Sequence, residues 1–155
     1  MASKDEFEVV REANIAAPPA TVFGLLADFH RWPEWSPWEQ LDPDMKRTHS
    51  GAPSGVGAVY EWEGNRKAGK GRMEITAAEP SSRIQLALQF LKPFKSNNTT
   101  TFDLTPRDGG THVKWLMVGP KTFLTRVMGI FSSMDKMVGR DFEKGLANLG
   151  NAATK

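Results

Sequence analysis

Residues 59–76 read VYEWEGNRKAGKGRMEIT and contain the clearest structural pattern in the chain. Apolar and charged residues alternate on both sides of the glycine-bounded stretch 64–69, which is typical of two antiparallel strands joined by a turn. A register that places Glu61 opposite Arg72 brings the charged side chains to one face and the apolar side chains to the other. The further pairs of this register are Glu63 with Lys70, Tyr60 with Met73, and Trp62 with Gly71.

The alternation continues through three more segments, so we expect the hairpin to be part of a larger antiparallel sheet. Turn signals at 79–82, 92–93 and 107–110 separate these segments. One face is then apolar across five strands while the other is solvated. The predicted outer layer contains Glu61, Arg72, Glu74, Gln85, Gln89, Asp103 and Lys114. The predicted inner pairs are Ala77 with Ile84, Ile75 with Leu86, Met73 with Leu88, Ile84 with Leu104, Leu86 with Phe102, Leu88 with Thr100, Phe90 with Asn98, Leu104 with Thr111, Phe102 with Val113, Thr100 with Trp115, and Asn98 with Met117.

The carboxyl-terminal segment predicts a long amphipathic helix that covers the apolar face of this sheet. Its apolar residues recur at gaps of three and four. Gly129, Gly139 and Gly145 lower helix propensity, and a break near 132–133 would give a short helix before a longer one. The apolar stripe consists of Val127, Ile130, Phe131, Met134, Met137, Val138, Phe142, Leu146 and Leu149.

The amino-terminal part predicts one strand and two short helices. Residues 7–15 have β-type composition, and Pro19 is suited to open a helix over 20–27. The stretch 29–38 holds three tryptophans and two prolines, which favours a second short helix followed by a plug that packs into the fold. The order is therefore one strand, two short helices, about six strands and a long helix, which is an α+β arrangement.

Composition excludes several functional classes. The chain has 155 residues and no cysteine, which excludes thiol catalysis, cysteine-based zinc sites and iron–sulfur clusters. A formal net charge of +2 is too small for a nucleic-acid-binding surface. No segment approaches the length of apolar residues that spans a membrane, and the first residues are charged and lack the apolar core of a secretory signal. We therefore expect one domain over residues 1–155 in the cytoplasm.

Several stretches resemble the SRPBCC superfamily, which includes START lipid-transfer domains and birch-pollen-allergen-like proteins. Taken together they are similar to its bacterial polyketide cyclase/dehydrase-like branch. The resemblance covers nearly the whole chain and implies the helix-grip fold, in which a curved antiparallel sheet of about six to seven strands wraps around the long terminal helix. The stretches that carry it are 15–23 (IAAPPATVF), 32–38 (WPEWSPW), 55–58 (GVGA), 69–73 (GKGRM), 92–94 (KPF), 110–115 (GTHVKW) and 134–146 (MDKMVGRDFEKGL).

The resemblance further implies a cavity between sheet and helix that holds a small hydrophobic molecule. Asn98 and Thr100 are polar residues on the predicted apolar face, so they either orient a ligand or bind a water molecule there. We place the pocket mouth at the row of Trp62, Gly71, Phe90, Asn98 and Met117. The candidate ligand-binding residues are Trp35, Trp38, Tyr60, Trp62, Met73, Leu88, Phe90, Asn98, Thr100, Trp115, Met117, Phe131, Met134 and Met137.

Each of these residues has a simpler structural interpretation. The methionines adapt to irregular cavities but are also ordinary core residues. Trp35 and Trp38 either line the cavity or plug the end of the core. His30, His49 and His112 are far apart in the sequence and share no ligand spacing, so we expect neither a metal site nor another cofactor.

Three functions are compatible with the sequence. The first is a binding or carrier protein for a lipid, polyketide or aromatic metabolite, because the predicted lining is apolar and few ionisable groups converge on it. The second is a polyketide cyclase or dehydratase, which needs an acid or base beside the ligand. Glu61, Arg72 and Glu74 have suitable side chains, but the predicted register places them on the solvated face. The third is a protein–protein adaptor, and the sequence leaves the oligomeric state open.

Overall fold

The computed structural model describes residues 6–40, 42, 44–65, 69–92, 95–120 and 134–154. A strand is followed by a short α-helix, two 3-10 segments, six strands and a long α-helix. The two short helices predicted after the first strand correspond to α1 and η1. The elements are β1 Glu6–Ile15, α1 Pro19–Leu26, η1 Phe29–Glu34, η2 Pro37–Gln40, β2 Lys46–Gly51, β3 Ala58–Glu63, β4 Lys70–Glu79, β5 Arg83–Lys92, β6 Ser96–Arg107, β7 Gly110–Pro120 and α3 Met134–Ala153.

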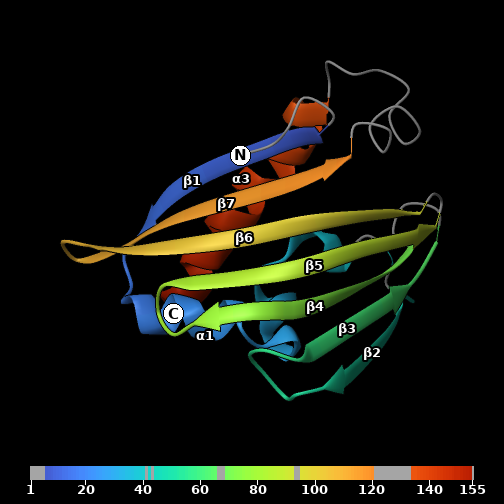
Figure 1. The fold of residues 1–155 in the computed structure, drawn as a ribbon. Helices are drawn as coiled ribbons and strands as arrows, with labels where there is room; N and C mark the ends of the chain where they lie inside the picture. Colours follow the sequence, from blue (N-terminus) through green and yellow to red (C-terminus); the bar gives the residue numbers. More distant parts are fainter. Residues whose placement is uncertain are drawn as a thin grey trace.

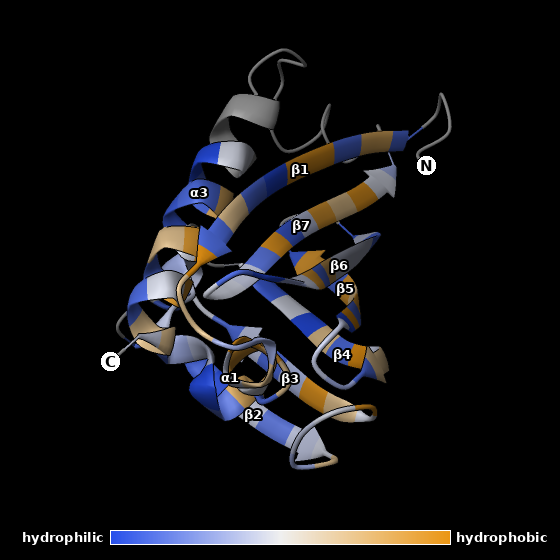
Figure 2. Ribbon diagram, turned by 90° about the vertical axis from the view of Figure 1, so that its left-hand side faces the viewer, coloured by the Kyte–Doolittle hydropathy of each residue, from blue (hydrophilic) through white to orange (hydrophobic). Residues whose placement is uncertain are grey.

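Within the described residues, seven strands form one antiparallel sheet in the order β1-β7-β6-β5-β4-β3-β2. The sheet curves, and α3 runs along its inner side (Figure 1). Seen from the side, α1 lies on the same side of the sheet as α3, and apolar and polar residues alternate along β1 (Figure 2). The predicted helix-grip α+β fold is therefore confirmed. No helix in the described parts of the chain is long and apolar enough to cross a membrane.

The hairpin of β3 and β4 has the predicted register. Glu61 is exposed on the outer face, whereas Tyr60 is only 3% exposed on the inner face. The guanidinium of Arg72 forms an ion pair at 3.1 Å with Glu74 of the same strand. The alternation of charged and apolar residues thus determines which face is solvated. The observed pairs are Glu61 with Arg72, Glu63 with Lys70, Tyr60 with Met73, and Trp62 with Gly71.

Strands β4 and β5 start in the predicted register and then shift. The shift lies between Ile75 and Ala77, so Ile84 pairs with Ala78 instead of Ala77. An irregularity of this kind inserts a residue into one strand and increases local twist. The pairs Met73 with Leu88 and Ile75 with Leu86 are as predicted.

The registers predicted for β5–β6 and β6–β7 are wrong by two residues. Ile84 lies opposite Phe102 instead of Leu104, and Phe102 lies opposite Trp115 instead of Val113. Because side chains alternate with a period of two, this shift leaves every residue on its predicted face and changes only its neighbours. The other observed pairs are Leu86 with Thr100, Leu88 with Asn98, Phe90 with Ser96, Leu104 with Val113, and Thr100 with Met117.

The positions of the two turns account for both shifts, and the turn between β6 and β7 lies one residue later than predicted. Arg107 pairs with Gly110, so Asp108 and Gly109 alone form the turn between β6 and β7. Gly109 has a φ of +76°, as tight hairpin turns require. Similarly, β5 runs to residue 92 and β6 starts at residue 96, so their connection is shorter than the predicted one.

The tryptophan-rich segment forms the predicted plug and terminates α1. The indole Nε1 of Trp32 donates to the carbonyl of Leu26 at 3.1 Å, and that of Trp35 donates to the carbonyl of Leu25 at 3.2 Å. The last carbonyls of a helix have no partner within the helix, so the two indoles satisfy groups that would otherwise be buried without one. The plug is therefore fixed to the end of α1 by its polar atoms.

Helix α3 approaches the sheet closely at two glycines. A Cβ atom on Gly139 would collide with the guanidinium of Arg11, which crosses the helix to pair with Glu143 at 2.9 Å. A Cβ atom on Gly145 would lie 2.8 Å from the ring of Trp115. These glycines thus permit close packing, at the cost of helix propensity. The possible break near 132–133, and with it Val127, Gly129, Ile130 and Phe131, lies outside the described residues.

Candidate functional site

The inner face of the sheet is buried at one end and half-buried at the other. Alternation along the strands directs the side chains inward, and Ile84 and Val113 are fully buried. Further along, Met73 and Leu88 keep partial exposure although they pack against the same core. Accessible apolar surface therefore remains at the end of the sheet where we predicted the pocket mouth. The half-buried apolar residues of this end are Trp62, Met73, Leu88 and Phe90.

The indole ring of Trp62 contacts Gly71, Phe90 and Tyr60. Its ring lies on the backbone of Gly71, where any Cβ atom would collide with it. It meets Phe90 edge-to-face at a centroid distance of 6.0 Å and stacks on Tyr60 at 6.3 Å. Edge-to-face and stacked contacts of this kind hold aromatic rings in defined positions. The half-buried end thus has an ordered aromatic wall.

Asn98 is a buried polar residue beside this apolar surface. It is 4% exposed and lies opposite Leu88. Its Oδ1 accepts a hydrogen bond from Ser96 Oγ at 3.2 Å, and the missing side chain of Gly119 makes room for that oxygen. Its Nδ2 has no hydrogen-bond partner among the described residues. The predicted row needs a correction, because Ser96 takes the place beside Phe90 that we assigned to Asn98.

Thr100 and Met117 lie next to Asn98, two residues along β6 towards the closed end of the interior. They face each other across β6 and β7 and are 6% exposed each. Both are therefore on the predicted inner face and close to Asn98 in the sheet. Sequence reasoning missed Ser96, although its place two residues before Asn98 puts it on the same face.

Trp35 and Trp115 belong to the closed end of the interior. Each is 1% exposed, and the ring of Trp115 stacks on that of Phe142 at 4.0 Å. Trp38 is half-buried, meets Trp115 edge-to-face, and donates from Nε1 to Asp141 of α3 at 3.2 Å. The Nε1 atom of Trp115 is buried without a hydrogen-bond partner among the described residues.

Three predicted residues cannot be placed in the site. Phe131 lies outside the described residues. Met134 and Met137 fall within α3, but in a part of it whose side chains the structure does not describe.

A buried acid that the sequence gave no reason to expect lies at the edge of the sheet. Glu39 of η2 is 8% exposed and accepts a hydrogen bond from the Tyr60 hydroxyl at 2.6 Å. Arg47 of β2 donates to the other carboxylate oxygen at 2.8 Å and to the Glu39 carbonyl at 2.7 Å. Burial and the hydrogen bond to Glu39 raise the pKa of Tyr60 above its usual value. The three residues fasten η2 to the edge strands.

Two of the histidines lie together, which the sequence analysis did not predict. The rings of His30 and His49 stack at 4.2 Å, and His30 Nδ1 is 2.9 Å from the Asp28 carboxylate. Desolvation, followed by the charge of His30, lowers the pKa of His49. The described residues nevertheless contain no group of three or more histidine, aspartate or glutamate side chains that could hold a metal ion.

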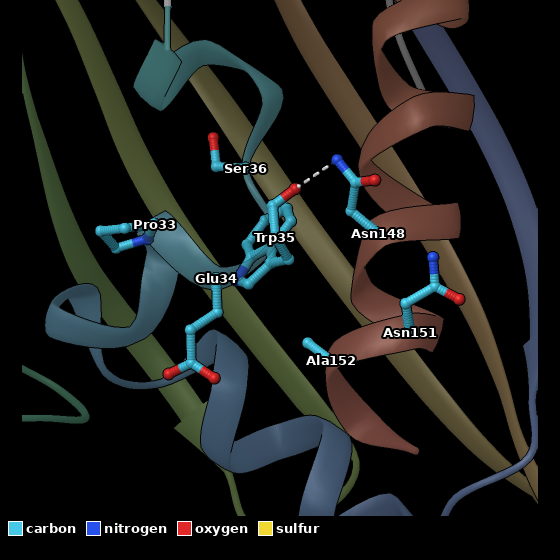
Figure 3. Close-up of a pocket in the computed structure, with 7 residues that line it drawn as sticks. All are labelled: Pro33, Glu34, Trp35, Ser36, Asn148, Asn151 and Ala152. Atoms are coloured by element: carbon cyan, nitrogen blue, oxygen red, sulfur yellow. Dashed lines mark hydrogen bonds between the residues drawn. The ribbon is translucent and has the colours of Figure 1, made fainter. Parts of the chain in front are cut away.

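A separate cavity of about 190 Å³ lies between η1 and the end of α3 (Figure 3). The Asn148 side chain donates to the Trp35 carbonyl at 3.1 Å on its wall, and the carboxylate of Glu34 lies on the opposite side. Trp35 is the one predicted ligand-binding residue in its lining. This polar cavity is therefore not the apolar pocket that the sequence predicts.

The fold is shared by solved structures, whereas no curated protein matches the sequence. A protein from Chromobacterium violaceum has 16% identity and a TM-score of 0.67, and the similarity covers 99% of each chain. A protein from Mesorhizobium loti has 22% identity and a TM-score of 0.66, over 94% of this chain and 96% of that one. The crystal structure of Ara h 8.0201 has 15% identity and a TM-score of 0.60, over 96% of this chain and 94% of that one.

Sequence comparison identifies the family. Residues 6–154 match the family model described as polyketide cyclase / dehydrase and lipid transport. The match spans the strands, the tryptophan plug and α3, and it agrees with the predicted resemblance to the SRPBCC superfamily. The chain is thus a member of the polyketide cyclase / dehydrase and lipid transport family.

Proposed function

We propose that the protein binds a small hydrophobic molecule against the half-buried end of its inner face. The observation that carries this proposal is the group of half-buried apolar side chains around a buried amide with an unused donor. Small-molecule sites typically combine an apolar lining with a few polar groups that fix orientation. Trp62, Met73, Leu88 and Phe90 supply the lining, and Asn98 supplies the polar group. Trp35 and Trp115 then form the closed end of the pocket.

Binding of a neutral fluorescent probe tests this proposal. N-Phenylnaphthylamine becomes strongly fluorescent in apolar sites, and we expect the protein to bind it. Replacing Leu88 by Ala removes apolar contact area, and a loss equivalent to one buried methylene, about 0.8 kcal/mol, predicts roughly fourfold weaker binding. Gln89→Ala is the matched control, because Gln89 neighbours Leu88 in sequence but points to the outer face.

Native mass spectrometry of the purified protein provides an independent test, and we expect a retained apolar molecule. Absence of probe binding would contradict the proposal, as would equal weakening by the Leu88 and Gln89 substitutions. Thermal unfolding of both variants controls for loss of the fold.

A cyclase or dehydratase is the second candidate, and the family description favours it. Glu39 is the one buried carboxylate among the described residues, and both of its oxygens already accept hydrogen bonds from Tyr60 and Arg47. A free acid or base beside the apolar lining would be needed for this chemistry. Incubation with a linear polyketone thioester, followed by mass spectrometry for loss of water, would detect such an activity. Because Glu39 is already engaged, we favour binding.

A further inference from the structure

We infer that the ligand carries a neutral hydrogen-bond acceptor, a carbonyl oxygen, which the Nδ2 group of Asn98 binds. This inference rests on the proposed function and specifies the chemical class of its ligand. The basis is the set of buried hydrogen-bond donors that have no partner among the described residues.

The amide of Asn98 has its oxygen occupied and its nitrogen free. An asparagine amide offers one acceptor oxygen and two N–H donors. Ser96 Oγ donates to Oδ1, and the backbone of Gly119 lies against the same oxygen, so the acceptor end is seated against β6 and β7. Nδ2 is buried and lacks an acceptor among the described residues. A buried donor without a partner is costly, and an acceptor supplied by a ligand removes that cost.

The second unused polar atom points to the same class of ligand. Among the described residues, the buried side-chain atoms without a hydrogen-bond partner are Asn98 Nδ2 and Trp115 Nε1. Indole nitrogen is a donor only. Both unpaired atoms are hydrogen-bond donors, and an oxygen atom of a ligand could accept from them. This favours ketones, esters and amides over hydrocarbons as ligands.

The surroundings of the amide favour a neutral acceptor over a carboxylate. In the described part of the sheet, Asn98 lies opposite Leu88, while Phe90 and Met117 face inward on the neighbouring strands. A buried carboxylate needs a cationic partner, and none of these side chains provides one. An apolar molecule with one carbonyl oxygen near its end fits both the lining and the donor.

A pair of shape-matched probes tests the inference. Methyl naphthyl ketone and isopropenylnaphthalene differ only in a carbonyl oxygen that is replaced by a methylene group. One hydrogen bond predicts that the wild-type protein binds the ketone roughly three- to tenfold more tightly, measured by displacement of N-phenylnaphthylamine. Asn98→Leu should abolish this preference while retaining binding of the alkene.

Asn97 provides the matched control. It carries the same side chain one residue earlier, but it is exposed on the outer face opposite Gln89. Asn97→Leu should keep the full preference for the ketone. Infrared spectroscopy of the bound ketone gives a second readout, since a hydrogen bond lowers the carbonyl stretching frequency. We expect this lowering in the wild-type protein, so the inference stays testable even if Asn98→Leu does not fold.

The outcomes separate the inference from the proposed function. Equal affinity of the wild-type protein for ketone and alkene overturns the inference alone, because binding itself is then retained. A preference that survives in Asn98→Leu overturns it as well, as does a bound ketone with an unshifted carbonyl band. Failure of the wild-type protein to bind either probe or the dye overturns both the inference and the proposed function.

Discussion

Tyr60 is the single tyrosine of the chain, so its ionisation can be followed without interference from other phenols. Its hydroxyl donates to the buried Glu39 carboxylate, and burial together with this contact raises its pKa. We expect no tyrosinate absorbance from the folded protein around pH 10 to 11, where a free tyrosine ionises at about 10. Since the folded-state pKa lies above the unfolded one, the stabilisation is complete below pH 10 and is lost as pH rises towards the folded-state value.

The measurement is an ultraviolet titration performed together with circular dichroism. Tyrosinate should appear only at pH values at which circular dichroism shows that the protein unfolds. A normal titration in the folded state would contradict the predicted burial. Arg47→Met serves as a comparison, because it removes a cation that opposes the rise in pKa.

The stacked histidines predict a pKa shift of the opposite sign, a lowering at His49. Desolvation and the neighbouring charge of His30 lower the pKa of His49 below its ordinary value. The unfolded state then binds this proton more tightly, so the contribution to stability is present above about pH 6.5 and is lost as pH falls through the folded-state pKa. Proton NMR should show that His30→Asn raises the pKa of His49. An unchanged value would show that the contact between the rings has no electrostatic effect.

At the scale of elements, α3 depends on the absence of a side chain at Gly145. Alanine there would improve helix propensity by about 1 kcal/mol but would collide with the stacked ring of Trp115, and overpacking costs about 1–3 kcal/mol. We expect Gly145→Ala to destabilise the protein by about 1 kcal/mol. Gly150 of the same helix meets only Ile15, at an ordinary 3.7 Å, so Gly150→Ala should stabilise it. Urea unfolding of both variants tests the contrast, and equal effects would refute it.

The strands show what the sequence determines and what it leaves undetermined. Opposite charges favour the observed register of β3 and β4, since a shift by two residues in one direction would place Glu61 opposite Glu74. Along β5, β6 and β7, apolar residues repeat every second position, so a shift by two residues preserves the pattern. For β6 and β7, the position of the Asp108–Gly109 turn distinguishes the two registers. Contacts between elements, such as Glu39 with Tyr60 or His30 with His49, have no periodic signal and were therefore missed.

At the scale of the whole molecule, ligand binding and stability are linked. A ligand that binds only the folded state at about 100 times its dissociation constant raises the free energy of unfolding by about 2.7 kcal/mol. We expect methyl naphthyl ketone to stabilise the wild-type protein by this amount in urea titrations, and Gln89→Ala equally. Leu88→Ala at the same ketone concentration should gain about 1 kcal/mol less, because its dissociation constant is larger. An equal gain in the free energy of unfolding for Leu88→Ala and Gln89→Ala would show that the ketone does not bind beside Leu88.

Four of the five tryptophans contact one another, whereas Trp62 is linked to them through Tyr60 and Phe29. Trp32, Trp35, Trp38 and Trp115 form one chain of touching rings, with centroid distances of 4.6 to 5.7 Å. Trp62 contacts Tyr60 and Phe90 instead. Excitation energy migrates readily within the first group, so its emission reports on folding. If the proposed site binds its ligand, the emission of Trp62 should change on binding, and a difference spectrum against Trp62→Phe isolates that signal.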